Sequence, residues 1–203
     1  MVLINVILGS TREVSIGQRL FKYLENEIAP TVSEKEEINF KFIHLEDYDL
    51  PFFYEEIMPR DNLERQLKSN EQKWVTDMKT ADGYLFVTPQ YDNSISGVLK
   101  NALDFIGWEG AKKPAKIISY SDDMFGGQIG GQALMPILES LGMIVLPTIT
   151  KISNLTANYN ATGFLTDNAP EAECYQKDLL ESLHEIGIYA KILKENPYHE
   201  FND

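Results

Sequence analysis

Hydrophobic residues along the chain follow two spacings, one typical of buried strands and one typical of amphipathic helices. The run VLINVIL at 2–8 is almost continuously apolar and rich in β-branched residues, which predicts a central strand buried on both faces of a parallel sheet. The segment 38–45 alternates apolar and polar residues, so we expect a strand at a sheet edge. Three more short strands are predicted at 83–88, 115–121 and 143–149.

Between these strands the apolar residues recur three or four positions apart, as in helices. A first helix is expected to start at Ser15, which has capping-box spacing to Gln18. The apolar positions of a second helix are Leu63, Leu67, Trp74, Val75 and Met78. Further helices are predicted around 98–106, over 129–141 and within 172–194. Five strands that alternate with helices predict a doubly wound α/β sheet.

Length and charge narrow the class of protein. The 203 residues show no repeat or interdomain linker, so we expect one domain over 1–203. The 31 acidic and 18 basic residues give a formal charge of −13, which argues against nucleic-acid binding because phosphates need basic partners. The single cysteine, Cys174, the absence of a signal-peptide pattern and the lack of a long apolar stretch predict a cytoplasmic protein that does not enter the membrane.

The first loop of interest, GSTREVS at 9–15, has the composition of an anion site. In a doubly wound sheet, ligands bind where loops leave the carboxyl ends of the strands. Arg12 is the only basic residue among the first 18, and it stands with Ser10, Thr11 and Ser15 just before a predicted helix. Hydroxyls, the guanidinium and the helix dipole favour a phosphate there over an ordinary capped helix start. No Walker lysine and no GxGxxG pattern follow, which disfavours triphosphates and a Rossmann-type dinucleotide.

Two more loops supply backbone-rich surfaces. TPQYDNS at 88–94 contains turn-forming residues and Tyr91, so its main chain can face a planar heterocycle. SDDMFGGQIGG at 121–131 contains four glycines, which let the main chain approach a ligand closely. Together the three loops suggest a mononucleotide with a flat ring and no catalytic side chain.

The motifs in these loops resemble those of the NADPH-dependent FMN reductase family. GSTREVSIGQRL is similar to the GSxRxxS segment of that family, and TPQYDNSISGVLKNALDFI is similar to its TPxYNxSxPxxLKNALD segment. A glycine-rich loop followed by LGMIVLP extends the resemblance over nearly all of residues 1–150. The resemblance implies a flavodoxin-like fold with a five-stranded parallel sheet in the order 2-1-3-4-5.

The resemblance also implies a role for each loop. The first loop would line the FMN phosphate through Ser10, Arg12, Ser15 and Ile16. The second would contact the flavin ring and ribityl chain through Pro89, Gln90, Tyr91, Asp92 and Ser94. The third, 121–127, would line the other edge of the ring, including Ser121, Asp122, Gly126 and Gly127.

The implied activity is that of an FMN-dependent NAD(P)H oxidoreductase. FMN would take a hydride from NADPH, or NADH, and pass two electrons to a small acceptor such as a quinone, azo dye, nitro compound or free flavin. Ping-pong kinetics and a homodimer or dimer of dimers would follow. The alternatives are a flavodoxin-like electron carrier, whose phosphate loop usually reads TxTGxT, and a flavin-free interaction or signalling domain.

Some positions depart from the family pattern. Asp92 stands where asparagine is common, Ser96 where proline is common and Met135 where arginine is frequent. The aromatic loop at 49–62 either covers a neighbouring subunit's flavin or packs locally. Trp108 and the apolar side of the last helix contribute either to a subunit contact or to the core.

Other polar residues have ordinary interpretations. Lys100, Asn101 and Asp104 are expected to support the preceding loop or a dimer contact. The three histidines, His44, His184 and His199, lack metal-ligand spacing, so we predict no metal site. Cys174 is expected to be a small buried thiol.

Overall fold

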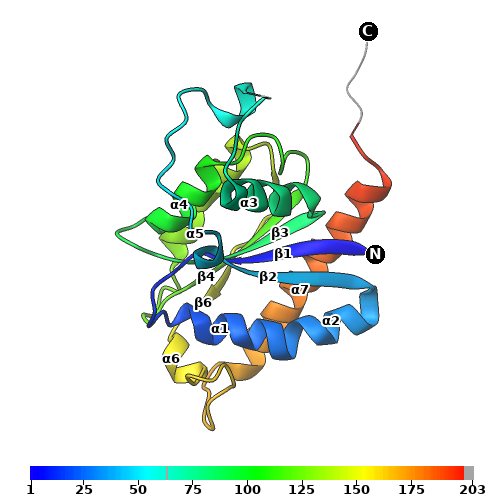
Figure 1. The fold of residues 1–203 in the computed structure, drawn as a ribbon. Helices are drawn as coiled ribbons and strands as arrows, with labels where there is room; N and C mark the ends of the chain where they lie inside the picture. The colour runs from blue at the N-terminus through cyan, green and yellow to red at the C-terminus, as the bar shows by residue number, and fades with distance from the viewer. Residues whose placement is uncertain (63, 199–203) are drawn as a thin grey trace.

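The computed structural model describes residues 1–62 and 64–198, and its strands form one parallel sheet (Figure 1). The strands are β1 (Val2–Leu8), β2 (Ile38–His44), β3 (Gly83–Pro89), β4 (Pro114–Tyr120), β5 (Ile144–Val145) and β6 (Thr150–Ile152). Their order is β2-β1-β3-β4-β5, with β6 also paired to β4. The order confirms the predicted flavodoxin-like sheet, with β1 inside it and β2 at an edge.

The predicted fifth strand at 143–149 is interrupted. Its first part, β5, pairs with Pro114 and Ala115, whereas β6 begins only at Thr150 and pairs with the end of β4. Pro147 has no N–H to give to the sheet, and Thr148 has a φ of 66°. These two residues bend the chain away from β4, so one predicted strand becomes two short ones beside the same neighbour.

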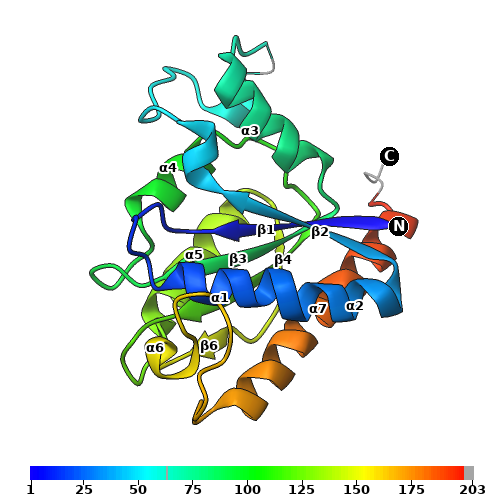
Figure 2. The same cartoon turned by 60° about the horizontal axis from the view of Figure 1, so that its bottom comes forward.

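Helices cover both faces of the sheet (Figures 1 and 2). One face carries the helical segments α1 (Gly17–Tyr23), η1 (Leu24–Ile28), α2 (Ala29–Glu36) and α7 (Ala172–Glu195). The other carries α3 (Ser69–Thr80), α4 (Gly97–Asp104) and α5 (Gln128–Ser140). Each face has its own buried apolar cluster, so the sheet lies between two cores. The short helices are η2 (Leu45–Tyr48), η3 (Pro59–Asp61) and α6 (Leu155–Asn158).

The first helix begins at Gly17, and the capping box predicted from Ser15 and Gln18 is absent from it. Ile16 already has helical dihedral angles and its side chain caps nothing, so Ser15 lies outside the helix. The helix then continues to Glu36 through the π-helical turn η1. Pro30 explains that turn, because it has no N–H for the carbonyl four residues earlier and the ladder shifts to a wider repeat.

The second helix, α3, also starts later than predicted. Leu63 lies outside the described residues, and Leu67 belongs to the loop that precedes α3. The buried carboxylate of Glu71 accepts the Lys68 N–H at 2.8 Å, which ends the loop and starts the helix. Apart from the short helix η3, the described segments 49–62 and 64–68 are therefore irregular and do not belong to α3.

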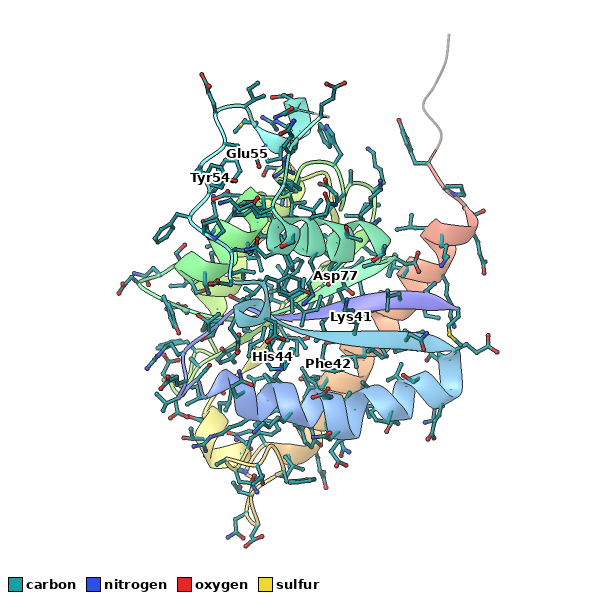
Figure 3. All side chains as sticks on the ribbon, in the orientation of Figure 1. Lys41, Phe42, His44, Tyr54, Glu55 and Asp77 are labelled. Atoms are coloured by element: carbon teal, nitrogen blue, oxygen red, sulfur yellow. The ribbon has the colours of Figure 1, made fainter. Side chains whose placement is uncertain are left out.

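Polar contacts join α3 to the edge strand of the sheet. The Asp77 carboxylate accepts hydrogen bonds from Lys41 Nζ and Tyr48 Oη, both at 2.6 Å. Figure 3 shows Lys41 on β2 beside Asp77. Phe42 and His44, on the same strand, lie on its other side, which faces α1. The same figure places Tyr54 and Glu55 well away from these residues, on the 49–62 loop. That loop therefore stands over α3 and α4 rather than over the β2 edge.

The last helix, α7, packs with its apolar side in the core. Leu179, Leu183, Ile186 and Ala190 are all fully buried, so the core interpretation of this stripe is correct. Cys174, however, is exposed, and its Sγ contacts Asp178 Oδ2 at 3.7 Å, so the predicted burial of this thiol was wrong. The cysteine lies off the stripe defined by Tyr175 and Leu179 and therefore faces solvent. His199 lies outside the described residues.

None of the helices in residues 1–62 and 64–198 combines the length and apolar character needed to cross a bilayer.

Candidate functional site

Three loops meet at the carboxyl ends of β1, β3 and β4, on one side of the sheet (Figures 1 and 2). A pocket of about 210 Å³ lies between them. Its lining residues are Arg12, Val14, Ser15, Ile16, Pro89, Gln90, Tyr91, Tyr120, Ser121 and Asp122. Parallel strands place their carboxyl ends at one edge, so the topology brings together loops that are about 80 and 110 residues apart in the sequence.

The first loop places both of its charged residues, Arg12 and Glu13, at the surface and its two serines inside. Arg12 is exposed, with its guanidinium carbon 6.0 Å from the centroid of the Tyr91 ring. Ser10 and Ser15 are buried, and Ser10 Oγ lies 3.2 Å from Tyr91 Oη. The Ser15 N–H donates to the Arg12 carbonyl at 3.0 Å, which closes a turn just before α1. The loop thus presents the Arg12 cation and the Ser15 hydroxyl to the pocket, as an anion site requires.

The second loop is a tight two-residue turn. The Tyr91 and Ser94 N–H groups donate to each other's carbonyls, both at 2.8 Å, in an isolated antiparallel bridge. The two central residues, Asp92 and Asn93, have φ values of 46° and 61°, as in a type I′ turn. Asp and Asn both tolerate this left-handed conformation, which explains how Asp92 replaces the commoner asparagine.

A side-chain hydrogen bond joins the second loop to the first. The Ser96 hydroxyl donates to the Gly9 carbonyl at 2.6 Å, and its oxygen accepts the Leu99 N–H at 3.2 Å as the N-cap of α4. Ser96 is buried, and the Gly9 N–H donates to the Val87 carbonyl at 2.8 Å. Serine at this position therefore ties the start of the first loop to β3 and α4.

The third loop is held by its own carboxylate. Asp123 Oδ1 accepts from the Ser121 hydroxyl and the Phe125 N–H, both at 2.7 Å. These hydrogen bonds, the Ser121 hydroxyl first, lower the pKa of Asp123, so the acceptor stays ionised. Gly126 and Gly127 have positive φ values, and a Cβ on Gly127 would lie 2.5 Å from the Tyr120 carbonyl. Glycine is therefore required where this loop turns back against β4.

Gln90 links the second and third loops. Its Oε1 accepts the N–H groups of Ile129 at 3.0 Å and Gly130 at 3.3 Å, at the start of α5. A Cβ on Gly130 would lie 2.8 Å from the Pro89 carbonyl, so the two segments touch through their backbones. Because the side-chain oxygen is used by α5, the amide NH₂ is the part of Gln90 left for a ligand.

Asp122 is also engaged within the protein. Its carboxylate accepts the N–H and the hydroxyl of Thr156, at 2.8 and 2.7 Å, at the start of α6. It lines the pocket, but its charge stabilises the neighbouring helix. Of the other predicted residues, Ser94 is exposed on the turn, and Ser121 borders the pocket while donating to Asp123.

The pocket also contains a residue that the sequence analysis missed. Tyr120, the last residue of β4, is 2% exposed, and its hydroxyl has no hydrogen-bond partner in residues 1–62 and 64–198. Its hydroxyl lies against Gly17, so close that a Cβ on this glycine would be 2.0 Å from Tyr120 Oη. In the sequence, Tyr120 belongs to an apolar strand run and looks like an ordinary core residue. Its position as the final strand residue before a ligand-facing loop was the only available signal.

The aromatic loop at 49–62 divides between core and surface. Phe53 packs edge-on against Phe105, with ring centroids 5.3 Å apart, whereas Phe52 is 88% exposed. Asn101 holds this loop by accepting the Phe53 N–H at 2.9 Å and donating to the Pro51 carbonyl at 2.8 Å. Asn101 therefore supports the 49–62 loop rather than the loop that precedes its helix, and local packing accounts for only part of the aromatic cluster.

No cluster of three or more His, Cys, Asp or Glu side chains suited to a metal ion occurs within the described part of the chain.

Comparison with known proteins gives a consistent picture. The family model for NADPH-dependent FMN reductase matches residues 2–157. An NAD(P)H-dependent FMN reductase of Schizosaccharomyces pombe is 32% identical over 96% of this chain and 92% of its own length. A quinone reductase of Pseudomonas putida is 29% identical over 69% of this chain and 71% of its own. The flavoenzyme NAD(P)H:(acceptor) oxidoreductase FerB from Paracoccus denitrificans shares the fold with a TM-score of 0.71 at 21% identity, over 95% of this chain and 98% of that one.

The loop junction at Ser96 generates the first prediction. Ser96→Ala removes the α4 cap and leaves the Gly9 carbonyl without its donor, so the free energy of unfolding should fall by about 1–3 kcal/mol. Urea unfolding followed by circular dichroism measures this change. Ser94→Ala is the matched control, because Ser94 is exposed and its turn is held by backbone groups. Equal stability of the Ser96→Ala variant and the wild type would contradict the junction.

Proposed function

Because the chain is an enzyme of the NADPH-dependent FMN reductase family, we propose that it binds FMN at the three-loop pocket and transfers two electrons from NAD(P)H to a small acceptor. The observation that carries the proposal is the pocket itself, which joins Arg12 and the buried Ser15 to a tight backbone turn at the carboxyl edge of the sheet. This is the edge at which doubly wound folds bind mononucleotides.

The residues present fit FMN at its phosphate end. FMN carries a phosphate, and the first loop offers the Arg12 guanidinium, which is exposed, together with the Ser15 hydroxyl. Arg12 is the one basic side chain among the residues that line the pocket, in a protein of net charge −13. A buried hydroxyl without a partner, that of Tyr120, also lies in the pocket wall. An anion would bring hydrogen-bond acceptors to a donor-rich loop.

The other two loops fit a flat ring. The second loop uses the N–H groups of Tyr91 and Ser94 to close its own turn, so a donor that it offers to a ring edge comes from Asp92 or Asn93. Gln90 has its amide NH₂ available, while its oxygen holds α5 in place. Gly126 and Gly127 allow the third loop to lie close to β6 and β4, and Gly130 allows the start of α5 to lie close to the second loop.

When bound, FMN would supply the two-electron chemistry, and the chain's residues bind and orient it. Arg12 and Ser15 hold the phosphate, which sets the depth of the cofactor. The turn at 91–94 and the Asp123-braced loop at 121–127 form the walls on either side. Preorganised N–H donors in these walls favour negative charge at the ring edge they face.

Acceptors in this proposal are quinones, azo dyes, nitro compounds or free flavin, and the donor is NADPH or NADH. The relative from Pseudomonas putida named quinone reductase supports the first of these classes. The second candidate is an electron carrier of the flavodoxin type without its own reductase activity. GSTREVS differs from the TxTGxT phosphate loop of such carriers, so the enzyme is favoured.

Rapid mixing of the FMN-loaded protein with NADPH tests the reductase activity. The absorbance of oxidised flavin should disappear in a single-turnover reaction without any second protein, and a quinone added afterwards should restore it. NADH in place of NADPH measures the preference between the two donors. Flavin that stays oxidised with both donors, but is reduced once a separate reductase is added, would identify the protein as a carrier.

Arg12 provides a second test, directed at the phosphate. Arg12→Ala should remove a charged hydrogen bond worth about 1.5–3 kcal/mol and weaken FMN binding by about 10- to 150-fold, as measured by fluorescence titration. Riboflavin, which lacks the phosphate, should lose little affinity. Lys177→Ala on the exposed face of α7 removes the same charge away from the pocket and should leave both affinities unchanged. Equal losses for FMN and riboflavin would reject GSTREVS as the phosphate loop.

We also propose that the chain forms a homodimer or a dimer of dimers. Phe52, Met58 and Trp108 are more than half exposed, and they belong to the 49–62 loop and the segment after α4. A groove of about 330 Å³ with apolar walls lies between η3, α4 and α5, at Met58, Leu103 and Ile137. Apolar residues gathered in this way are typical of a subunit contact rather than of free surface.

Light scattering at micromolar concentration tests the oligomer. The wild type should have at least twice the mass of one chain, and Phe52→Ser with Met58→Ser should raise the dissociation constant by about tenfold or more. Val14→Ser, an equally exposed apolar residue on the phosphate loop, serves as the control. A wild type that remains monomeric at this concentration would exclude the proposed assembly.

A further inference from the structure

The hydroxyl of Tyr120 is a buried polar group that the proposed function leaves without a role. Tyr120 is 2% exposed, and its Oη has no hydrogen-bond partner among the described residues. A buried hydroxyl without a partner is destabilising compared with an apolar group of the same shape. Phenylalanine would fill the same space in the core, so the oxygen of Tyr120 does not stabilise the fold. We therefore expect it to serve another function.

The surroundings of this hydroxyl are specific. Tyr120 Oη reaches over the start of α1, where only the missing side chain of Gly17 leaves room for it. Burial raises the pKa of the phenol, and the hydroxyls of Ser15 and Ser10, which lie beside it, act against that rise. Neither serine completes a hydrogen bond with the phenol. Arg12 lies close enough to act in the same direction. The phenol is therefore surrounded by the donors of the phosphate loop.

Two properties of the phenol determine what it can do. Burial is the largest influence on Tyr120 and raises its pKa above the ordinary value, so the group stays protonated and is a donor at neutral pH. Tyr120 lines the pocket, but its hydroxyl oxygen is closed off from solvent, so a ligand in the pocket would reach the Ser15 hydroxyl rather than this oxygen. Tyr120 therefore acts through a neighbouring hydroxyl.

Ser15 is the better of the two neighbours for this role. Ser10 Oγ already has Tyr91 Oη at 3.2 Å, whereas none of the side-chain hydrogen bonds found among the described residues uses the Ser15 hydroxyl. Ser15 also lines the pocket, and it is the first of the two serines to influence the phenol. A hydroxyl that accepts one hydrogen bond can donate its own proton elsewhere, and the two bonds strengthen each other.

We propose that Tyr120 is a positioning residue of the phosphate site: its O–H donates to Ser15 Oγ, and this directs the Ser15 O–H toward the phosphate of FMN. The inference rests on the proposed function, because it assumes that the first loop holds the phosphate. When the Ser15 hydroxyl donates its proton to an anion, its oxygen can accept the hydrogen bond from Tyr120. Anion binding and satisfaction of the buried phenol are thereby coupled.

The variant Tyr120→Phe separates this role from a structural one. In the apoprotein it removes an unpaired buried hydroxyl, so the melting temperature should stay the same or rise by up to about 4 °C. FMN affinity, measured by fluorescence titration, should fall by about 2- to 12-fold, the effect of losing one neutral hydrogen bond. Riboflavin affinity should not change. A lower melting temperature with equal losses for both flavins, or no change in FMN affinity, would overturn the proposal.

A double-mutant cycle tests whether the effect passes through Ser15. Ser15→Ala alone should weaken FMN binding, and adding Tyr120→Phe to it should cause no further loss, because the relay is already broken. Losses that multiply would show that Tyr120 acts independently of Ser15 and would overturn the relay.

Gly17→Ala provides a second route to the same phenol. The new Cβ would displace Tyr120 Oη, so FMN affinity should fall while riboflavin affinity is kept in whatever fraction remains folded. Gly97→Ala is the matched control, since Gly97 is also the first residue of a helix and a Cβ there meets nothing within 4 Å. Loss of FMN affinity in both glycine variants, or in neither, would count against the role of Tyr120.

The wild type separates this inference from the proposed function. An apoprotein that binds neither flavin, or binds FMN no more tightly than riboflavin, would reject the phosphate site and with it the proposed function. A wild type that prefers FMN, together with a Tyr120→Phe variant that keeps the full preference, would reject only the role of Tyr120.

Discussion

The hydrogen bond from the Ser96 hydroxyl to the Gly9 carbonyl joins the two loops on which the pocket depends. Gly9 directly follows β1 and Ser96 is the N-cap of α4, so this contact fixes the distance between the first loop and the turn at 91–94. Both groups are buried, where an unpaired carbonyl would be costly, and the junction is therefore stable as well as specific. The remaining contacts of the pocket build on this fixed separation.

Around that junction the site is braced by side chains that bind neighbouring backbone. Gln90 holds the start of α5, Asp123 holds its own loop and Asp122 holds the start of α6. Each of these side chains uses an oxygen to satisfy N–H groups at a turn or helix start. The pocket walls are thus set before any ligand arrives, which reduces the ordering that binding requires.

At the pocket, one positively charged side chain lies close to several neutral hydroxyl groups. The protein is acidic, yet Arg12 stands at the mouth of the pocket, and the buried hydroxyls of Ser10, Ser15 and Tyr120 lie beneath it. In the proposed function, an anion bound there would accept a charged hydrogen bond from Arg12 and a neutral one from Ser15. The negative surface charge disfavours binding of a polyanion that would contact much of the molecule. The donor-rich first loop would favour a single phosphate bound at one place.

The alternation of buried strands and amphipathic helices predicted a doubly wound sheet, and the family resemblance of the motifs at 9–15 and 88–107 implied its strand order and the position of the pocket. Arg12 and Ser15 line that pocket, and their binding of an anion stays a prediction. These features are local in the chain, and parallel topology places all strand ends at one edge. The break of the fifth strand, the use of Gln90 and Asp122 as braces, the exposure of Cys174 and the contact between Ser96 and Gly9 depended on the tertiary structure. The orientation of Tyr120 also depended on the tertiary structure. In the sequence this tyrosine belongs to an apolar strand, and only the folded chain places its unpaired hydroxyl against Gly17. Hydrophobic periodicity records which residues are buried, but the partner of a buried polar atom is decided by groups that are distant in the sequence and meet only in the folded chain.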